Sequence, residues 1–410
     1  MYLAPRGRRE THTPRRTGYV TDQTVDLLAR LVSIDSANSS MGGPGEADLA
    51  AEIASFGHSH GLVVATDEVL PDRSNVSLTL PGTTGTHAGR RLLFDLHLDT
   101  VPHIGIPNAT VPRIDGDRMW GRGTCDTKGA LAAALVAVGR LAREVAERDG
   151  EVMLLFTVDE EYLKRGVAHA VAGGLNATAA IVGEPTSLRP IVAHKGAVRF
   201  RIVTHGRAAH TSKPENGDNA IHQMVEVIDW LRERGEPALS MRGHPRLTPP
   251  TFTIGTISGG VGVNIVPDRC VIDIDRRTLP TEDPVAVLAE IDGWLADLMR
   301  ARPGVKATRE DPYISERGLD GPVDGSLVVA VQAAVAKVTG GSVDATPDGV
   351  PYGTDATHLW GLAGIPTVVI GPGDIAQAHT IDEWVDLNDV RQCTEVYYEV
   401  MRSFVQGEWS

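Results

Sequence analysis

Histidine and carboxylate side chains recur in this sequence directly after apolar segments that are typical of buried strands. These residues are His97, Asp99, Glu160, Glu161, Glu184 and His379. The carboxyl ends of strands meet at one edge of an α/β sheet, so we expect these side chains to lie close together. Imidazole and carboxylate groups bind Zn²⁺, and consecutive buried carboxylates such as Glu160 and Glu161 need a compensating positive charge. The pattern predicts a site for divalent cations.

The glycine-rich segment Gly121 to Gly129 adds one more carboxylate, Asp126, just before an alanine-rich stretch. It resembles an anion-binding turn at a helix N-terminus, although its spacing fits neither a P-loop nor a dinucleotide-binding fingerprint. The alternative is that Asp126 only caps the helix that follows. Each acidic turn alone is typical of a solvated surface. If these residues converge, two histidines and three carboxylates are suited to a dinuclear site with a shared carboxylate.

Composition excludes several classes of function. The chain has 410 residues, with 39 Lys+Arg and 53 Asp+Glu, which gives a net charge of −14. This acid excess argues against a nucleic-acid partner, and no uninterrupted apolar stretch is long enough to cross a membrane. Cys125, Cys270 and Cys393 are far apart and odd in number, so we expect no disulfide framework and a cytoplasmic location. We expect Cys125 to be a small buried residue, not a nucleophile.

The sequence predicts two kinds of structural unit, one of which interrupts the other. Apolar runs at 91–96, 152–158, 179–183 and 367–371 predict strands buried on both faces of an α/β sheet, with helices at 21–34, 47–56, 129–147 and 327–338. Between them, the order strand–helix–strand–strand–helix–strand predicts a ferredoxin-like α+β unit. We therefore expect a disordered extension over 1–20 and a mixed-sheet α/β catalytic domain with helices on both faces. That domain would comprise 21–195 and 311–410, interrupted by an inserted domain at 196–310.

These motifs resemble the dinuclear zinc amidohydrolases that include acetylornithine deacetylase, succinyl-diaminopimelate desuccinylase, aminoacylase and glutamate carboxypeptidase. The resemblance covers about residues 21–405. It is carried by His97-Leu98-Asp99-Thr100-Val101-Pro102, by the Gly-Arg-Gly-x-x-Asp-x-Lys-Gly segment at 121–129, and by Asp159-Glu160-Glu161. Gly183-Glu184-Pro185-Thr186 and the segment 371–379 look most like acetylornithine deacetylase.

The resemblance implies a role for each residue of the site. The implied metal ligands are His97, Asp126, Glu161, Glu184 and His379, with Asp126 shared by two divalent cations. The expected cation is Zn²⁺, with Co²⁺ or Mn²⁺ as alternatives. The implied catalytic residues are Glu160 as general base, Asp99 as the residue that orients His97, and His210 as an oxyanion donor in the partner subunit's site. The implied substrate contacts are Arg276, which would clamp the α-carboxylate, Asn264, Gly353 and Thr354. A cis peptide is implied at Asp126–Thr127.

The implied activity is metal-dependent hydrolysis of the amide bond of an N-acyl amino acid, which releases a carboxylate and a free amino acid. The implied protein is a cytoplasmic homodimer that associates through its inserted domain. The alternatives are desuccinylase-like hydrolysis, hydrolysis of a dipeptide-like or carboxypeptidase-type substrate, and a non-catalytic metal-stabilised binding protein. The chain departs from the family at two places, and the second, beside a metal ligand, bears on the acyl or amine specificity. Thr127 stands where many members have Met, and 162–165 stands where many have small residues.

Overall fold

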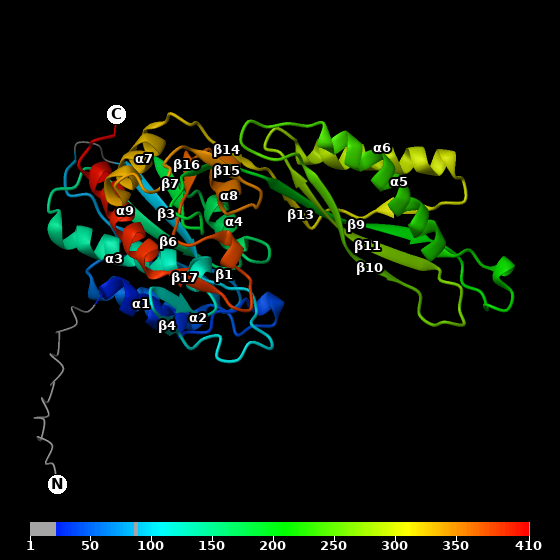
Figure 1. Cartoon of the computed structure of the whole chain (residues 1–410), viewed down its shortest axis with the longest axis horizontal. Coiled ribbons are helices and arrows are strands. Elements are labelled where there is room, and N and C mark those ends of the chain that lie inside the picture. Colours follow the sequence, from blue (N-terminus) through cyan, green and yellow to red (C-terminus); the bar gives the residue numbers. More distant parts are fainter. Residues whose placement is uncertain (1–21, 86–88, 410) are drawn as a thin grey trace, which may run out of the picture.

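The structure is a computed structural model that describes residues 22–85 and 89–409. The predicted extension at 1–20 lies outside the described residues. A larger α/β part carries both ends of the described chain, and an elongated part projects from it (Figure 1). The larger part contains a nine-stranded sheet, and the projecting part contains a five-stranded sheet.

The nine-stranded sheet is mixed. Its strands, in spatial order, are β1 (Val63–Leu70), β2 (Arg73–Leu80), β6 (Glu151–Thr157), β3 (Arg91–His97), β7 (Ala179–Val182), β16 (Thr367–Val369), β8 (Ile191–His194) and β14 (Leu319–Asp320), and β15 (Asp348–Val350) also pairs with β8. The central strands β6, β3, β7 and β16 are parallel. Their carboxyl ends therefore reach the same edge of the sheet, as the sequence predicts.

Helices cover both faces of this sheet. One face packs against α1 (Gln23–Val32), α2 (Ala47–Ser59), α3 (Gly129–Glu144), α7 (Ser326–Thr339) and α9 (Leu387–Val405), and the other against α4 (Arg165–Ala172) and α8 (Ala356–Gly361). The sequence of strand β3 explains why both faces are covered. Phe94 and Leu96 join the first core, whereas Leu93 joins the second. Successive side chains of a strand point to opposite faces, so an uninterrupted apolar run needs cover on both.

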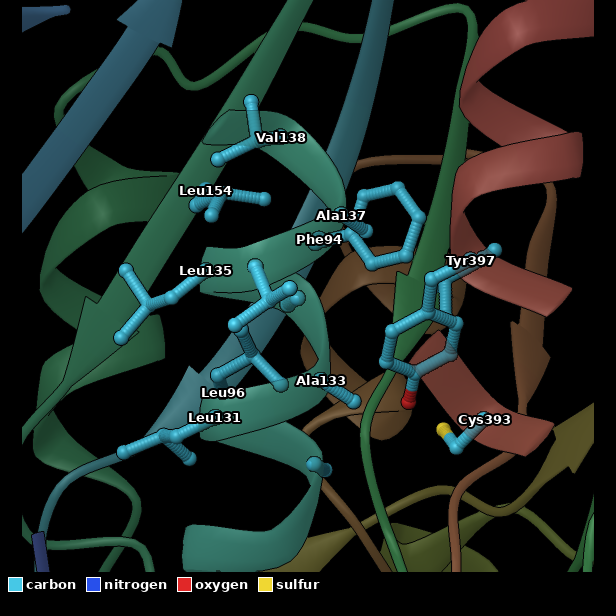
Figure 2. Close-up of a cluster of buried hydrophobic side chains, with 14 of the residues drawn as sticks. Phe94, Leu96, Leu131, Ala133, Leu135, Ala137, Val138, Leu154, Cys393 and Tyr397 are labelled. Atoms are coloured by element: carbon cyan, nitrogen blue, oxygen red, sulfur yellow. The ribbon is translucent and has the colours of Figure 1, made fainter. Parts of the chain in front are cut away.

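The core beneath the site is built between β3, α3 and α9 (Figure 2). Ala133 and Ala137 of α3 face Phe94 and Tyr397 (Figure 2), and their small side chains leave room for α9 to pack closely. The Phe94 and Tyr397 rings meet edge to face with centroids 5.0 Å apart. The Tyr397 hydroxyl donates a 2.6 Å hydrogen bond to the carbonyl of Ile370, which satisfies a buried polar group. These contacts hold the carboxyl end of β3 on a packed platform.

The projecting part has the predicted β-α-β-β-α-β order. Its elements are β9 (Gly196–His205), α5 (Ala220–Ser240), β10 (Thr251–Gly259), β11 (Arg269–Thr278), α6 (Pro284–Ala301) and β12 (Ala307–Arg309). The strands are antiparallel in the order β10-β11-β9-β12, and β13 (Ile314–Glu316) also pairs with β9. Helices α5 and α6 lie on one face of the sheet (Figure 1). We propose that this part is a separate domain inserted into the larger one.

Short elements complete the structure. They are β4 (Arg113–Asp115), β5 (Arg118–Trp120) and β17 (Trp384–Asp386), which form a three-stranded sheet, and the single turns Ser39–Met41, Thr124–Lys128, Pro214–Asn216 and Ile375–Gln377. In the part of the chain that the structure describes, no helix is both long and apolar enough to cross a membrane. The three free cysteines are all buried.

Candidate active site

His97 is the last residue of β3 and is buried at the carboxyl edge of the sheet. Its Nδ1 atom lies 2.9 Å from the backbone carbonyl oxygen of Asp99. A carbonyl oxygen only accepts hydrogen bonds, so Nδ1 carries a proton and Nε2 is the nitrogen that faces the carboxylates. Nε2 lies 3.0 Å from Oδ1 of Asp126 and 3.9 Å from Oε1 of Glu184. The imidazole nitrogen that could bind a cation therefore points toward these two carboxylates.

Asp126 lies at the centre of the cluster. Its Oδ1 atom faces His97, and its Oδ2 atom lies 3.3 Å from Nε2 of His379. His379 Nε2 is also 3.0 Å from Oε2 of Glu161. The two oxygens of one carboxylate thus face two different histidines. This is the arrangement in which Asp126 would be shared by two cations, with His97 and Glu184 on one side and Glu161 and His379 on the other.

The electrostatics of the cluster fit divalent cations. Burial raises the pKa of Glu161 to about 7 and that of Glu184 well above its usual range. Hydrogen bonds to Asp126 and Glu161 raise the pKa of His379 to about 11. Protein groups alone therefore leave the cluster short of positive charge, so that it retains protons. Ligand atoms bound to one tetrahedral ion at ~2.0–2.1 Å lie about 3.3 Å apart, and the contacts of Asp126 and His379 match this spacing.

The carboxylate of Asp99 holds the acidic loop in place. Its Oδ1 accepts a 3.0 Å hydrogen bond from the amide of Glu160, and its Oδ2 accepts hydrogen bonds from the amide of Glu161 at 3.1 Å and from Asn38 Nδ2 at 2.7 Å. The same carboxylate lies 3.6 Å from His97 Nδ1, which is farther than the Asp99 carbonyl oxygen. Asp99 thus contacts His97 with its carbonyl oxygen and, at the longer distance, with its carboxylate, and its role in orienting His97 stays a prediction.

The three consecutive acids after β6 have separate surroundings. Asp159 is bound to Arg165 at 2.6 Å and to Arg73 at 3.1 Å, and it accepts a hydrogen bond from Asn38 at 3.1 Å. These partners neutralise Asp159 away from the cluster. Asn38 carries no sequence signal of a functional residue, and it links this network to Asp99. By contrast, Glu160 has a carboxylate oxygen within 4.8 Å of ligand atoms of His97 and Glu184.

The loop that carries Asp126 is an anion cradle, but the anion belongs to the protein. The buried carboxylate of Glu383 accepts hydrogen bonds from the amides of Gly123 (3.0 Å), Cys125 (3.0 Å) and Asp126 (3.1 Å), and it pairs with Arg122 at 2.5 Å. The sequence predicts the cradle but gives no sign of its occupant.

The backbone around Asp126 confirms one expectation and contradicts another. The peptide between Asp126 and Thr127 is cis, as the resemblance implies. The alternative that Asp126 caps the following helix is wrong. Helix α3 begins at Gly129 after Lys128, without a side-chain cap, and Asp126 itself is extended (φ −120°, ψ 92°). Its carboxylate is therefore free to face His97 and His379.

Arg276 is not available to a substrate, which corrects the prediction that it clamps a carboxylate. Its side chain is 0% exposed and pairs with Glu282 at 2.6 Å. The cause is visible in β11, where Ile272 and Ile274 share its face and are buried. The neighbouring Arg277 points to the opposite face, is 28% exposed and pairs with Asp275 at 2.9 Å. Period-two alternation along β11 would have identified Arg277.

The remaining predicted contacts differ in their exposure. The Thr354 side chain is fully buried, with its hydroxyl 3.2 Å from His194 Nε2, which contradicts a side-chain contact with substrate. Gly353 beside it is half-buried. His210 and Asn264 are exposed, and a hydrogen bond of 3.2 Å joins the amide of Thr211 to the Asn264 carbonyl. Both follow the outer ends of β9 and β10.

The ten residues of β9 span about 30 Å from the edge of the main sheet. Neither His210 nor Asn264 therefore lies near His97 of the same chain.

Comparisons with known proteins show the family of this chain. Peptidase family M20/M25/M40 matches residues 93–403. The chain is 30% identical to an acetylornithine deacetylase of Myxococcus xanthus, over 79% of this chain and 83% of that protein. It is 32% identical to an N-acetyl-L-citrulline deacetylase of Xanthomonas campestris pv. campestris, over 94% of this chain and 98% of that protein.

Among solved structures, the fold is similar to that of the Bacillus subtilis YxeP protein, a dinuclear metal-binding peptidase. The TM-score is 0.69 at 17% identity, and the match covers 93% of this chain and 98% of that one.

Proposed function

Since this chain belongs to peptidase family M20/M25/M40 and is a metal-dependent amidohydrolase, we propose that it removes the acyl group from an N-acyl amino acid of the acetylornithine or acetylcitrulline type. The observation that carries this proposal is the Asp126 carboxylate, whose two oxygens face His97 and His379. The products would be a carboxylate such as acetate and a free amino acid. The first cation to test is Zn²⁺, because imidazole and carboxylate ligands suit it.

The cations would be held by His97, Asp126 and Glu184 on one side and by Asp126, Glu161 and His379 on the other. When bound, they would acidify a water molecule and polarise the acyl carbonyl. Glu160 is placed to take the proton from the attacking water and to pass it to the leaving amine. Asp99 supports this step by fixing the Glu160 amide at 3.0 Å. The substrate carboxylate would bind Arg277, which is exposed where Arg276 is not.

The active form that we propose is a homodimer through the inserted domain, located in the cytoplasm. His210 lies too far out to act in its own site, so its role as an oxyanion donor requires a second copy. The edge strand β10 and the loop after it carry exposed apolar side chains, and a second copy would cover them. These are Ile257 (57% exposed), Val261 (85%) and Val263 (99%). The three buried free thiols are compatible with a reducing compartment.

The test is a substrate panel assayed before chelation, after chelation and after addition of Zn²⁺, Co²⁺ or Mn²⁺. The panel contains N-acetyl-ornithine, N-acetyl-citrulline, N-succinyl amino acids and dipeptides. We expect the acetyl amino acids to be hydrolysed fastest, with activity lost on chelation and regained with metal. Faster hydrolysis of the succinyl compounds or dipeptides would reassign the substrate. Turnover that survives chelation would contradict the proposal.

The matched variant is Glu160→Gln, which keeps the shape of the side chain and removes the base. We expect at least a 100-fold loss of kcat, since general acid–base catalysis contributes roughly 10²–10⁴-fold. Metal content, measured by atomic emission, should stay at the wild-type level. Unchanged turnover would show that Glu160 is not the base.

A further inference from the structure

Lys164 is placed against the base of the proposed reaction. Its Nζ atom lies 3.1 Å from Oε1 of Glu160, and both side chains are largely buried, at 14% and 10% exposed. Within residues 22–85 and 89–409, Lys164 is the one side chain that forms an ion pair with Glu160. A fixed ammonium at one carboxylate oxygen restricts the orientation of the whole group.

The loop between these two residues has a shape that brings Lys164 back over Glu160. Asp159 and Lys164 both have positive φ, at 70° and 52°. Non-glycine residues rarely adopt this conformation. The amides of Leu163 and Lys164 donate to the Asp159 carbonyl oxygen at 3.2 and 2.7 Å, which closes the turn. The next residue, Arg165, leaves in another direction and binds the Asp159 carboxylate. Lys164 and Arg165 thus each pair with a different acid of the loop.

The ammonium of Lys164 is also held from its other side. Oε2 of Glu316, in β13 at the base of the inserted domain, lies 4.0 Å from Nζ. Burial would lower the pKa of Lys164, but the carboxylates of Glu160, Glu316 and Asp355 outweigh it and raise the pKa above its usual range. Lys164 therefore stays charged at any pH at which the enzyme works.

We propose that Lys164 is a positioning residue for Glu160. Its ammonium fixes one carboxylate oxygen while Asp99 fixes the Glu160 amide, so that the other oxygen faces the attacking water and the leaving amine. The proposal rests on the function proposed above. Preorganisation of this kind acts on turnover and not on substrate binding, because Lys164 contacts the base and not the substrate.

The experiment replaces the lysine and then rebuilds it chemically. Lys164→Cys removes the ammonium, and alkylation of the introduced thiol with 2-bromoethylamine restores a side chain of nearly the same length that ends in an ammonium. Alkylation with iodoacetamide gives a neutral side chain of similar bulk. The native cysteines are at most 1% exposed whereas the Lys164 side chain is 14% exposed, so the thiol at position 164 is the more accessible one. Wild type treated with each reagent controls for alkylation elsewhere, and mass spectrometry counts the groups added.

We expect Lys164→Cys to lose kcat by about 10- to 100-fold, the effect of misplacing a catalytic group, with KM within about threefold of wild type. Metal content should match that of wild type, while the melting temperature should fall, because the change removes one partner of a buried ion pair. Aminoethylation should recover most of the lost kcat, and carbamidomethylation should not. Wild-type kcat in Lys164→Cys, or equal recovery with both reagents, would overturn the proposal. The control Lys337→Cys removes an exposed lysine from α7, far from Glu160 in the sequence, and should keep wild-type kcat.

If Lys164→Cys does not fold, Lys164→Arg and Lys164→Met provide the comparison. Arginine should keep kcat within about fivefold of wild type, and methionine should not, because both fill the space but only arginine carries charge. Equal losses in the two variants would overturn the proposal. Failure of the proposed function can be distinguished from failure of this proposal. The first would be seen in the assays of wild type and Glu160→Gln, before position 164 is changed.

Discussion

Glu383→Gln tests how the loop that carries Asp126 is held. In the protein, one carboxylate oxygen of Glu383 accepts from the amides of Cys125 and Asp126, and the other accepts from the Gly123 amide and from Arg122. Glutamine has the same shape, but it replaces one of these oxygens with an NH₂ group that can only donate. In either orientation of the new amide, its NH₂ group faces two N–H donors that previously bound a carboxylate oxygen. The guanidinium of Arg122 also loses the negative charge of its partner.

The expected loss in the free energy of unfolding is about 3 kcal/mol. Removing one partner of a buried ion pair costs roughly 3–5 kcal/mol, because the remaining charge is buried without compensation. The side chain of Arg122 is only 5% exposed. Burial raises the pKa of Glu383, so the ionised carboxylate bears a desolvation cost from which glutamine is free. This relief is why we expect the lower end of the range.

The measurement is urea denaturation of the metal-free protein, with the free energy of unfolding compared between wild type and variant. Glu395→Gln is the matched control. It removes the same charge from an exposed pair, since Arg140 and Glu395 are 2.8 Å apart with side chains 33% and 48% exposed. Its effect should be below about 1 kcal/mol. A loss in Glu383→Gln no larger than in this control would refute the reasoning that the buried carboxylate holds the cradle.

Three further outcomes can be measured. Arg277→Met should raise KM by roughly 10- to 100-fold at an unchanged melting temperature, since hydrogen bonds to charged groups contribute about 1.5–3 kcal/mol. Arg276→Met should instead lower the melting temperature and leave KM unchanged, and the reverse pattern would return the clamp to Arg276. A mixture of the inactive variants His210→Ala and Glu160→Gln should regain part of the activity after subunit exchange, and no recovery would exclude action in the partner's site. Chelation should lower the melting temperature, because a metal at 1,000 times its Kd stabilises by about 4 kcal/mol; an unchanged melting temperature would argue against a metal centre.

Local sequence patterns predict the main sheet and the convergence of its polar strand ends. The runs that contain Phe94 and Leu154 are apolar on both faces, so each must be a central strand. Residues directly after such strands then share one edge of the sheet. His97, Glu161 and Glu184 come together for this reason, and the sequence needs no long-range information to indicate it.

Contacts between distant segments are what the sequence cannot supply. Glu383 binds the amide of Gly123 across 260 positions, and no local signal marks it as the occupant of the cradle. Arg276 is a different kind of error. The alternation Cys270, Ile272, Ile274 already turns position 276 into the core, and this local pattern outweighs the motif that points to Arg276. The short strands β4, β5 and β17 have three residues each, too few for a period to appear.

The segment inserted between the two halves of the main sheet also determines the order in which the residues of the site are synthesised. Ribosomes deliver the chain from its N-terminus, and 195 positions separate Glu184 from His379. At about 5–20 residues per second, some 10–40 seconds pass between the two. During this interval the nascent catalytic part would contain His97 and the acidic residues of the cluster but not His379. The inserted unit would already have all of its strands. With the ligand set proposed above, the cations would be held tightly only after translation has passed His379, and a chain that ends before that residue would lack this ligand.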